Sequence, residues 1–341
     1  MLRRRGIYLR EVIGMLRARA VDLAEICGLL FITAGLVVFP SELISAAKSG
    51  VELCLTVMLP SLFPFFVLSN LSVRLGFADK LGKALAPVMR PVFNVSGAGA
   101  AALALGFVGG YPVGAKTVIS LYKSGRLTKT EAERTLAYAN NSGPAFILGV
   151  VGTGIFAERG AGLALYLVHA LSSLIIGILF RFYKRGEKPE PYCAAAESRE
   201  SAVRAFIGSV GDGLGQCLSI SAFVLFFAVF IRLLFLSGAV GAAAELISVF
   251  GLPKESAESL ITGAIELTSG VWKLREIGAD FSSRLALAAF MLGWAGLSVH
   301  CQVLSFIEDS GLRKSTYFAG KLLHGVLSAA IIWLANMLGA W

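Results

Sequence analysis

The chain has 341 residues, of which 56% are hydrophobic and only 16% charged, and its net charge is +9. A soluble domain has about 25% charged residues, so this composition excludes a soluble enzyme or binding domain and indicates a polytopic all-α membrane protein. The excess of Lys and Arg lies beside apolar runs, where it orients helices and contacts anionic lipid. We therefore expect membrane lipid, and not nucleic acid, as a partner.

Seven apolar runs approach the roughly 20 residues that cross a bilayer. They cover 21–39, 51–74, 135–156, 161–182, 215–237, 284–307 and 317–338. Two more apolar stretches, 97–122 and 257–278, are interrupted by Gly, Pro and charged residues. About 24 helical residues folded back on themselves reach only some 18 Å per arm. Each interrupted stretch is therefore predicted to be a re-entrant hairpin.

Charge along the chain predicts the domain organisation. A basic arm at 1–20 precedes a first unit at 21–183, and a polar linker at 184–204 leads to a second unit at 205–341. Lys and Arg in the arm and the linker favour the cytoplasmic side for both. With two re-entrant hairpins, the N-terminus is then inside and the C-terminus outside.

The two units contain similar stretches in the same order. GFVGGYPVGAK (106–116) has the length and end residues of GAIELTSGVWK (263–273), and LVHALSSLII (167–176) aligns with LLHGVLSAAI (322–331) at nearly the same offset. One hairpin enters from each side of the membrane, so the units are predicted to be inverted repeats. Each would have a re-entrant helical hairpin and a discontinuous transmembrane helix, a plan typical of secondary transporters.

Candidate binding residues of the first unit lie in its hairpin and in the span that follows. Gly109 and Gly110 let the backbone approach a ligand closely, and Lys116 is a candidate anion contact or a side chain that extends to the membrane interface. The following span carries Asn140, Asn141 and Ser142 just before Gly-Pro. These polar residues at a helix break indicate either a binding site or a packing contact between helices.

In the second unit, Glu266 is the candidate coupling group, because a buried carboxylate can carry a proton or a cation. Its alternative is a structural ion pair. Ser269, Ser298 and His300 are further candidate substrate contacts, although His300 is equally consistent with a packing role. We find no nucleotide-binding loop and no metal-ligand spacing. No enzymatic activity, cofactor or metal is therefore expected.

The paired stretches GFVGGYPVGAK with YANNSGPAFILG, and ELTSG with GLSVHCQVLSF, resemble the YlbJ family of sporulation integral membrane proteins. That family belongs to the nucleoside-recognition, or Gate-domain, group and is similar to the concentrative nucleoside transporters. The likeness covers roughly residues 20–338.

The resemblance implies transport of dipicolinate or a similar small organic anion during endospore formation, across the outer forespore membrane from the mother cell. Lys116, in place of the Gln/Glu hairpin tips of nucleoside transporters, favours such an anion. A nucleoside or nucleobase carrier and a non-transporting scaffold for spore assembly are the alternatives. The coupling ion, H⁺ or Na⁺, the direction of flux and the formation of a homo-oligomer are left open.

Overall fold

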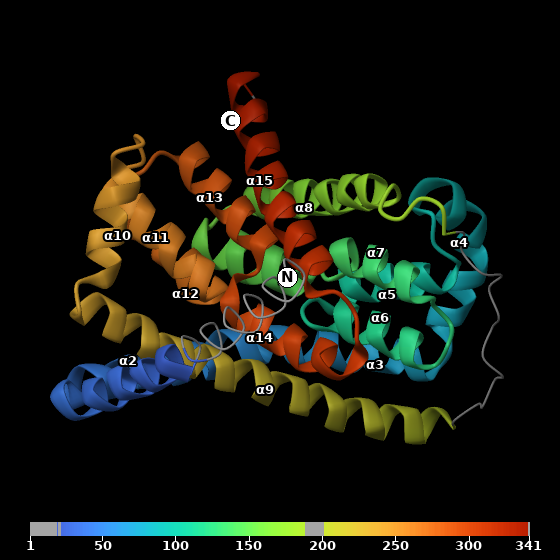
Figure 1. Ribbon diagram of the computed structural model, residues 1–341, viewed down its shortest axis with the longest axis horizontal. Helices are drawn as coiled ribbons and strands as arrows, with labels where there is room; N and C mark the ends of the chain where they lie inside the picture. The colour runs from blue at the N-terminus through green and yellow to red at the C-terminus, as the bar shows by residue number, and fades with distance from the viewer. Residues whose placement is uncertain (1–18, 20–21, 188–200, 340–341) are drawn as a thin grey trace, which may run out of the picture.

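The computed structural model describes residues 19, 22–187 and 201–339, which form helices joined by turns, with no strand among them (Figure 1). The predicted arm at 1–20, apart from Arg19, and the linker segment at 188–200 lie outside the described residues. The prediction of an all-α membrane protein is confirmed.

Five helices of the described chain are long and apolar enough to cross a membrane. They are Pro40–Arg74, Arg159–Phe180 (α8), Ala202–Leu236 (α9), Phe281–Ser310 and Lys314–Met337 (α15). The first combines α2 (Pro40–Leu53), η1 (Cys54–Met58) and α3 (Leu59–Arg74), and the fourth combines α13 (Phe281–Trp294), α14 (Gly296–Ile307) and η3 (Glu308–Ser310). The helices predicted at 51–74 and 215–237 thus begin earlier, at Pro40 and Ala202.

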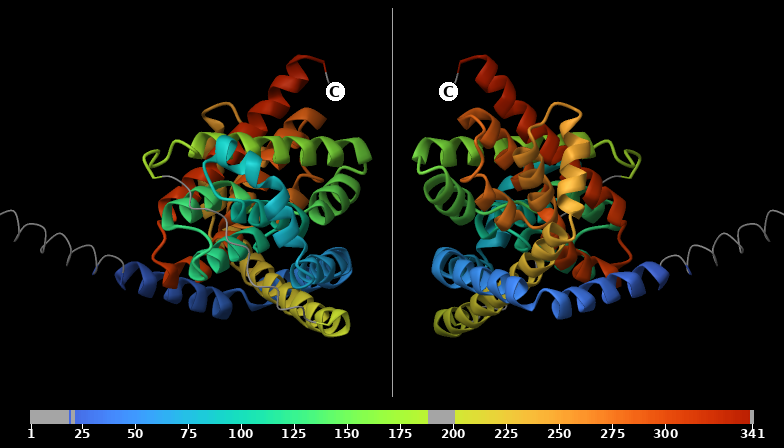
Figure 2. Two further views of the ribbon diagram at one scale, coloured as in Figure 1. Left: turned by 90° about the vertical axis from the view of Figure 1, so that its right-hand side faces the viewer. Right: turned by 90° about the vertical axis from the view of Figure 1, so that its left-hand side faces the viewer.

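The predicted run 21–39 is helical, whereas the predicted run 135–156 is not one continuous helix. The run 21–39 is a helix at 22–38 that bends at Phe39, exposes almost all its side chains and extends away from the body of the molecule (Figure 2). The run 135–156 is two short helices, α7 (Lys129–Ala139) and η2 (Ala145–Ile155). Pro144 has no N–H to donate and so cannot continue the hydrogen-bond ladder of α7.

Both interrupted stretches form helical pairs that turn back on themselves. The first consists of α5 (Ala98–Gly109) and α6 (Val113–Lys123), and the second of α11 (Lys254–Ile265) and α12 (Leu267–Lys273). The helix α4 (Phe77–Phe93) precedes the first hairpin and is bent by 97° from α5. The helix α10 (Ala239–Ser248) connects α9 to the second hairpin.

The hairpins and broken helices lie between two sets of long helices. α3 and α9 pack side by side along one edge of the molecule, and α8 runs along the opposite edge (Figure 1). α15 crosses between them and packs against α13, α7 and α8. The order hairpin, broken helix, long helix occurs once on each side of the linker. The inverted-repeat relationship itself stays a prediction.

Glycines allow the first hairpin and α15 to pack directly on α7. A Cβ added at Gly106 or Gly114 would overlap the carbonyl of Ala139, the last residue of α7, and one at Gly320 would overlap Ala137. In the second hairpin, a Cβ at Gly270 would overlap Gly263 of the other arm. Small residues at such contacts let helix backbones approach closely in membranes.

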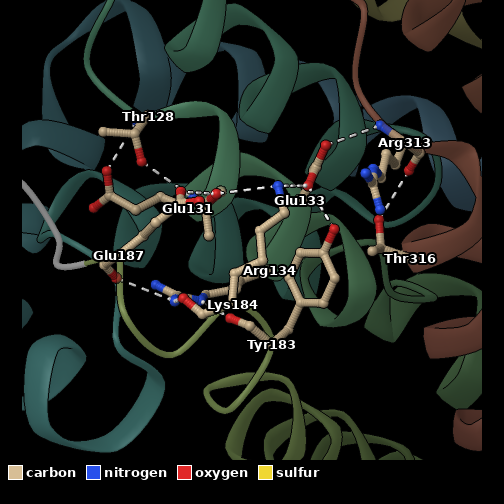
Figure 3. A network of polar contacts seen from close by, with 10 residues as sticks. Thr128, Glu131, Glu133, Arg134, Tyr183, Lys184, Glu187, Arg313 and Thr316 are labelled. Carbon is tan, nitrogen blue, oxygen red and sulfur yellow. Dashed lines mark hydrogen bonds and ion pairs between the residues drawn. The ribbon is translucent and has the colours of Figure 1, made fainter.

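A cluster of polar side chains joins α7 to the turn after α8 and to the start of α15 (Figure 3). Arg134, only 1% exposed, donates to the carbonyls of Asn94, Tyr183, Lys184 and Glu187 at 2.7–3.2 Å. These bonds satisfy carbonyls in the turns that follow α4 and α8, so the guanidinium fixes both turns on α7.

Glu133, in the same cluster, is fully buried and accepts three hydrogen bonds. They come from the Tyr183 hydroxyl at 2.8 Å, the Lys184 amine at 3.1 Å and the Arg313 N–H at 3.2 Å. Burial raises the pKa of this carboxyl, but the hydrogen bonds from Tyr183 and Lys184 outweigh it and hold the pKa below 4.5. The carboxylate therefore joins α7 to the start of α15.

We expect Gly106→Ala to destabilise the protein by about 3 kcal/mol, because the new methyl group has to displace the Ala139 carbonyl. Thermal unfolding in detergent measures the change. Gly215→Ala in α9 is the matched control, since no atom lies within 4 Å of its added Cβ. Equal stability of the two variants would contradict the close packing.

We expect Glu133→Gln to lower the free energy of unfolding by about 1–3 kcal/mol, because it leaves buried donors without a charged acceptor. A carboxyl whose pKa is depressed by folding stabilises the protein at neutral pH, and this contribution is lost as the pH falls through the folded-state pKa. The variant should therefore lose less stability than the wild type below pH 4.5.

Unfolding curves as a function of pH test this expectation. The control is Glu308→Gln, which removes an exposed pair with Lys314 and should cost about 0.5 kcal/mol or less. A Glu133→Gln protein with the wild-type pH profile would rule out the assigned contribution.

Candidate functional site

The two hairpin tips and the two helix breaks meet at one cavity of about 610 Å³, part of it open to solvent. Its apolar wall includes Phe65 and Phe66 of α3, Ile220 and Val224 of α9, and Phe146 of η2. Its polar lining comprises Tyr111, Ser142, Glu266, Thr268, Ser298 and Gln302. Among the described lining residues, Glu266 is the one with a charged side chain. The cavity thus combines aromatic surface with a few polar groups, as small-molecule sites do.

The tip of the first hairpin lies against the break in α7–η2. Gly110 adopts a positive φ of 71°, and a Cβ there would lie 2.8 Å from the backbone nitrogen of Gly143. Only glycine permits both this conformation and this approach.

The break itself begins at Asn140, whose backbone is extended with φ −91° and ψ 94°. In a continuous helix its carbonyl would accept the N–H of residue 144. That residue is Pro144, so the sequence leaves this carbonyl free.

The second hairpin shows the same arrangement with different residues. Glu266 is extended at the tip, and its carboxylate accepts the N–H groups of Thr268 and Ser269 at 2.9 and 2.6 Å, which caps α12. Ala295 and Gly296, both with positive φ, break the helix between α13 and α14. A Cβ at Gly296 would lie 2.9 Å from the backbone nitrogen of Leu267. Each tip therefore lies against the break of the next helix.

Polar contacts tie the first tip to the second unit. The Tyr111 hydroxyl donates to the Leu292 carbonyl of α13 at 2.6 Å. Lys321 of α15 donates to that hydroxyl and to the Asn140 carbonyl, each at 2.9 Å. The free carbonyl in the first break is thus satisfied by the last helix of the chain.

A second set of contacts follows beside the cavity. The Asn140 amide lies 3.5 Å from the Tyr317 hydroxyl, which lies 2.9 Å from Nδ1 of His300. His169 accepts the N–H of Ser142 at 3.0 Å, and its ring lies 4.3 Å from that of His324. Side chains of α8 and α15 therefore contact the first break, and Tyr317 links it to His300 of α14.

The structure brings together most of the residues expected from the sequence. Gly109, Gly110, Ser142, Glu266 and Ser298 line the cavity. Asn140 and His300 lie in the polar contacts beside it, and the Asn141 amide donates to the Tyr138 carbonyl at 3.0 Å. Ser269 lines a neighbouring cavity, which shares Val224 with the first.

Lys116 and Lys273 lie elsewhere. Lys116 is exposed on α6, beside Ser120 and Lys123, and is absent from the described lining of the central cavity. Lys273 pairs with Glu258 at 3.0 Å and contacts the Phe235 ring. Lys116 lies about one helical turn after the first tip and Lys273 about two turns after the second. Neither lysine is among the described residues that line the central cavity.

Tyr111, Thr268, Gln302, Tyr317 and Lys321 are the site residues that sequence reasoning missed. A signal for two of them was present, because the last span carries polar residues at 317, 321, 324 and 328. This spacing places them on one face of a helix. In the structure that face is buried.

Two helices begin at the cavity. Ala145 and Phe146 are the first residues of η2, and Ser298 and Val299 belong to the first turn of α14. Helix starts present free N–H groups and a partial positive charge, which favour a bound anion. Among the described residues, no group of three or more His, Cys, Asp or Glu could hold a metal ion.

Comparison with known proteins identifies relatives of the whole chain. A family model described as Gate, nucleoside recognition, matches residues 55–184. The sporulation integral membrane protein YlbJ of Bacillus subtilis (strain 168) is 31% identical over 331 residues, which cover 89% of this chain and 80% of that protein.

Two solved structures show the same fold. CNTnw in an inward-facing substrate-bound state aligns with a TM-score of 0.57 and 16% identity over 96% of this chain and 86% of that one. A CNTnw variant in an outward-facing state aligns with a TM-score of 0.62 and 16% identity over 97% of this chain and 86% of that one. The chain belongs to the YlbJ family of sporulation integral membrane proteins and has the fold of the concentrative nucleoside transporters.

Proposed function

We propose that this protein is a secondary transporter that moves a small planar carboxylate, of which dipicolinate is the best candidate, through the central cavity by alternating access. The observation that carries the proposal is the meeting of both hairpin tips and both helix breaks at one cavity. In inverted-repeat transporters such discontinuous helices form the substrate site.

The chemistry of the cavity supports a ring-bearing anion. The side chains of Phe65, Phe66 and Phe146 provide a wall for a flat ring. The starts of η2 and α14 supply positive dipole ends that can attract a carboxylate group. The helix starts thus take the role of anion contact that the sequence analysis assigned to Lys116. Attraction for an anion thus comes from backbone rather than from lysine.

Glu266 is proposed as the coupling group. Its carboxylate lines the cavity and repels an anionic solute unless it holds a proton. Binding of the solute then favours binding of a proton at Glu266, so the two move together. The backbone N–H groups of Thr268 and Ser269 keep the carboxyl group at the tip while its charge changes.

A nucleoside carrier is the second candidate. Glu266, Ser298 and Gln302 could accept or share hydrogen bonds with sugar hydroxyls, and the phenylalanine wall suits a base equally well. The matching family model is described as nucleoside recognition.

A location in the outer forespore membrane, with export from the mother cell, is proposed from the relationship to YlbJ.

We expect purified protein in proteoliposomes to take up labelled dipicolinate saturably. Unlabelled dipicolinate should compete at least about tenfold better than uridine or adenosine, because nucleosides lack the charge that the helix starts bind. Better competition by a nucleoside would favour the second candidate. Flux of neither compound would favour a scaffold without transport activity.

We expect Glu266→Gln to abolish accumulation of solute driven by a proton gradient while exchange of labelled for unlabelled solute continues. The amide keeps the shape of the side chain but cannot carry a proton. Both fluxes are measured in the same proteoliposomes. Glu245→Gln is the control, because Glu245 lies on α10, is exposed and pairs with Lys254 away from the cavity. Proton-driven accumulation by the Glu266→Gln protein would reject the coupling role.

A further inference from the structure

Lys321 is an ionisable side chain inside a membrane-spanning helix. It belongs to α15 and is only 1% exposed. Burying an ammonium group away from water is costly unless polar groups of the protein replace its hydration. The Tyr111 hydroxyl and the Asn140 carbonyl do so at 2.9 Å each, and the Tyr111 ring centre lies 4.8 Å from the amine.

The surroundings of Lys321 solvate a cation without neutralising it. In the part of the chain that the structure describes, no carboxylate pairs with this amine. The titratable groups around it include Tyr111, His169 of α8 and His300 of α14, and Tyr317 and His324 of its own helix. Oxygen dipoles and an aromatic face therefore hold the charge, as they hold a bound alkali cation or ammonium ion.

The sequence leaves a carbonyl at this place that needs a donor and favours a positive one. Pro144 leaves the Asn140 carbonyl without a helical donor, and that carbonyl lies at the C-terminal end of α7, where the helix dipole is negative. In secondary transporters, carbonyls of unwound helices coordinate the coupling Na⁺ or H⁺. Here the carbonyl is already bonded to an ammonium group that the protein itself supplies.

We propose that Lys321 is a resident cation that occupies the place of a soluble alkali cation between the first hairpin tip and the broken helix α7–η2. The amine bonds to both Tyr111 and Asn140, so the contact between the hairpin tip and the helix break forms without Na⁺. Removing the side chain would turn the same oxygens into a site for a small monovalent cation. Asn140 and Tyr111 would be its ligands, with the Tyr317 hydroxyl 3.5 Å from the Asn140 amide.

Thermal unfolding of the full chain in detergent tests the proposal without any transport assay. NaCl and choline chloride are compared at equal ionic strength, because choline is too large to enter the space left by a lysine side chain. We expect the wild type to unfold at the same temperature in both salts. The Lys321→Ala protein should unfold at a lower temperature than the wild type and should be stabilised by Na⁺ by roughly 3 °C or more.

Propylammonium provides a matched rescue, since it has the atoms that Lys321→Ala removes. It should stabilise this variant, whereas 1-propanol, which has the same shape but no charge, should not. Lys123→Ala, on the exposed face of α6, is the control and should respond to neither cation. A folded Lys321→Ala protein that neither Na⁺ nor propylammonium stabilises would overturn the proposal.

Lys321→Arg keeps the test decisive if the alanine variant does not fold. Arginine retains a positive charge at this position, so we expect that variant to remain insensitive to Na⁺. Stabilisation of the wild type or of Lys321→Arg by Na⁺ would show an open cation site and would contradict a resident cation.

The consequence for transport rests on the proposed function. We expect uptake of labelled dipicolinate by wild-type proteoliposomes to be unchanged when choline replaces Na⁺. A strict requirement for Na⁺ would overturn the inference while leaving the transport function intact. Absence of all flux, together with the expected unfolding results, would reject the proposed function and leave the resident cation standing.

Discussion

The architecture depends on the rule that each backbone N–H and C=O inside a membrane needs a partner within the protein. A chain that interrupts its helices to build a binding site must therefore supply replacement partners at each interruption. At the second tip, the Glu266 side chain binds the free N–H groups of α12. At the first break, Lys321 binds the free carbonyl of Asn140. The free N–H groups of the second tip are thus bound by a carboxylate of the same turn, and the free carbonyl of the first break is bound by a lysine from a distant helix.

Much of this arrangement could be predicted from local sequence. Apolar runs predicted five of the spanning helices, and the Gly- and Pro-rich interruptions predicted two hairpins, because these residues cannot continue a helical ladder. Polar residues at a helix break pointed to Asn140 and Ser142, a loosened span pointed to Ser298, and a carboxylate inside an apolar stretch pointed to Glu266. The run 21–39 forms the expected helix over 22–38 with most of its side chains exposed, and its crossing of the membrane stays a prediction.

The partners themselves could not be predicted, because they come from distant parts of the chain. Lys116 was selected for its nearness to a hairpin tip in sequence, yet helical rotation carries its side chain to the exposed face of α6. Lys321 lies within a continuous apolar span that gives no sign of a binding site, yet its amine contacts Tyr111 at the first hairpin tip. Tertiary packing decides which face of each helix contacts a given break. That packing cannot be derived from the periodicity and motifs of a single sequence.

The bond between Lys321 and Asn140 also bears on how the protein is made. Asn140 leaves the ribosome well before α15, and translation proceeds from the N-terminus. Until the last helix is inserted, the break in the first unit has a carbonyl without its lysine, and the Tyr111 hydroxyl lacks its bond from Lys321. The first unit therefore cannot reach its final structure on its own. The residues that line the cavity all precede α15, but the bonds that hold the first tip and the first break together form only when the C-terminal helix arrives. A prematurely terminated chain therefore has the lining of the site without the helix that fixes its first half.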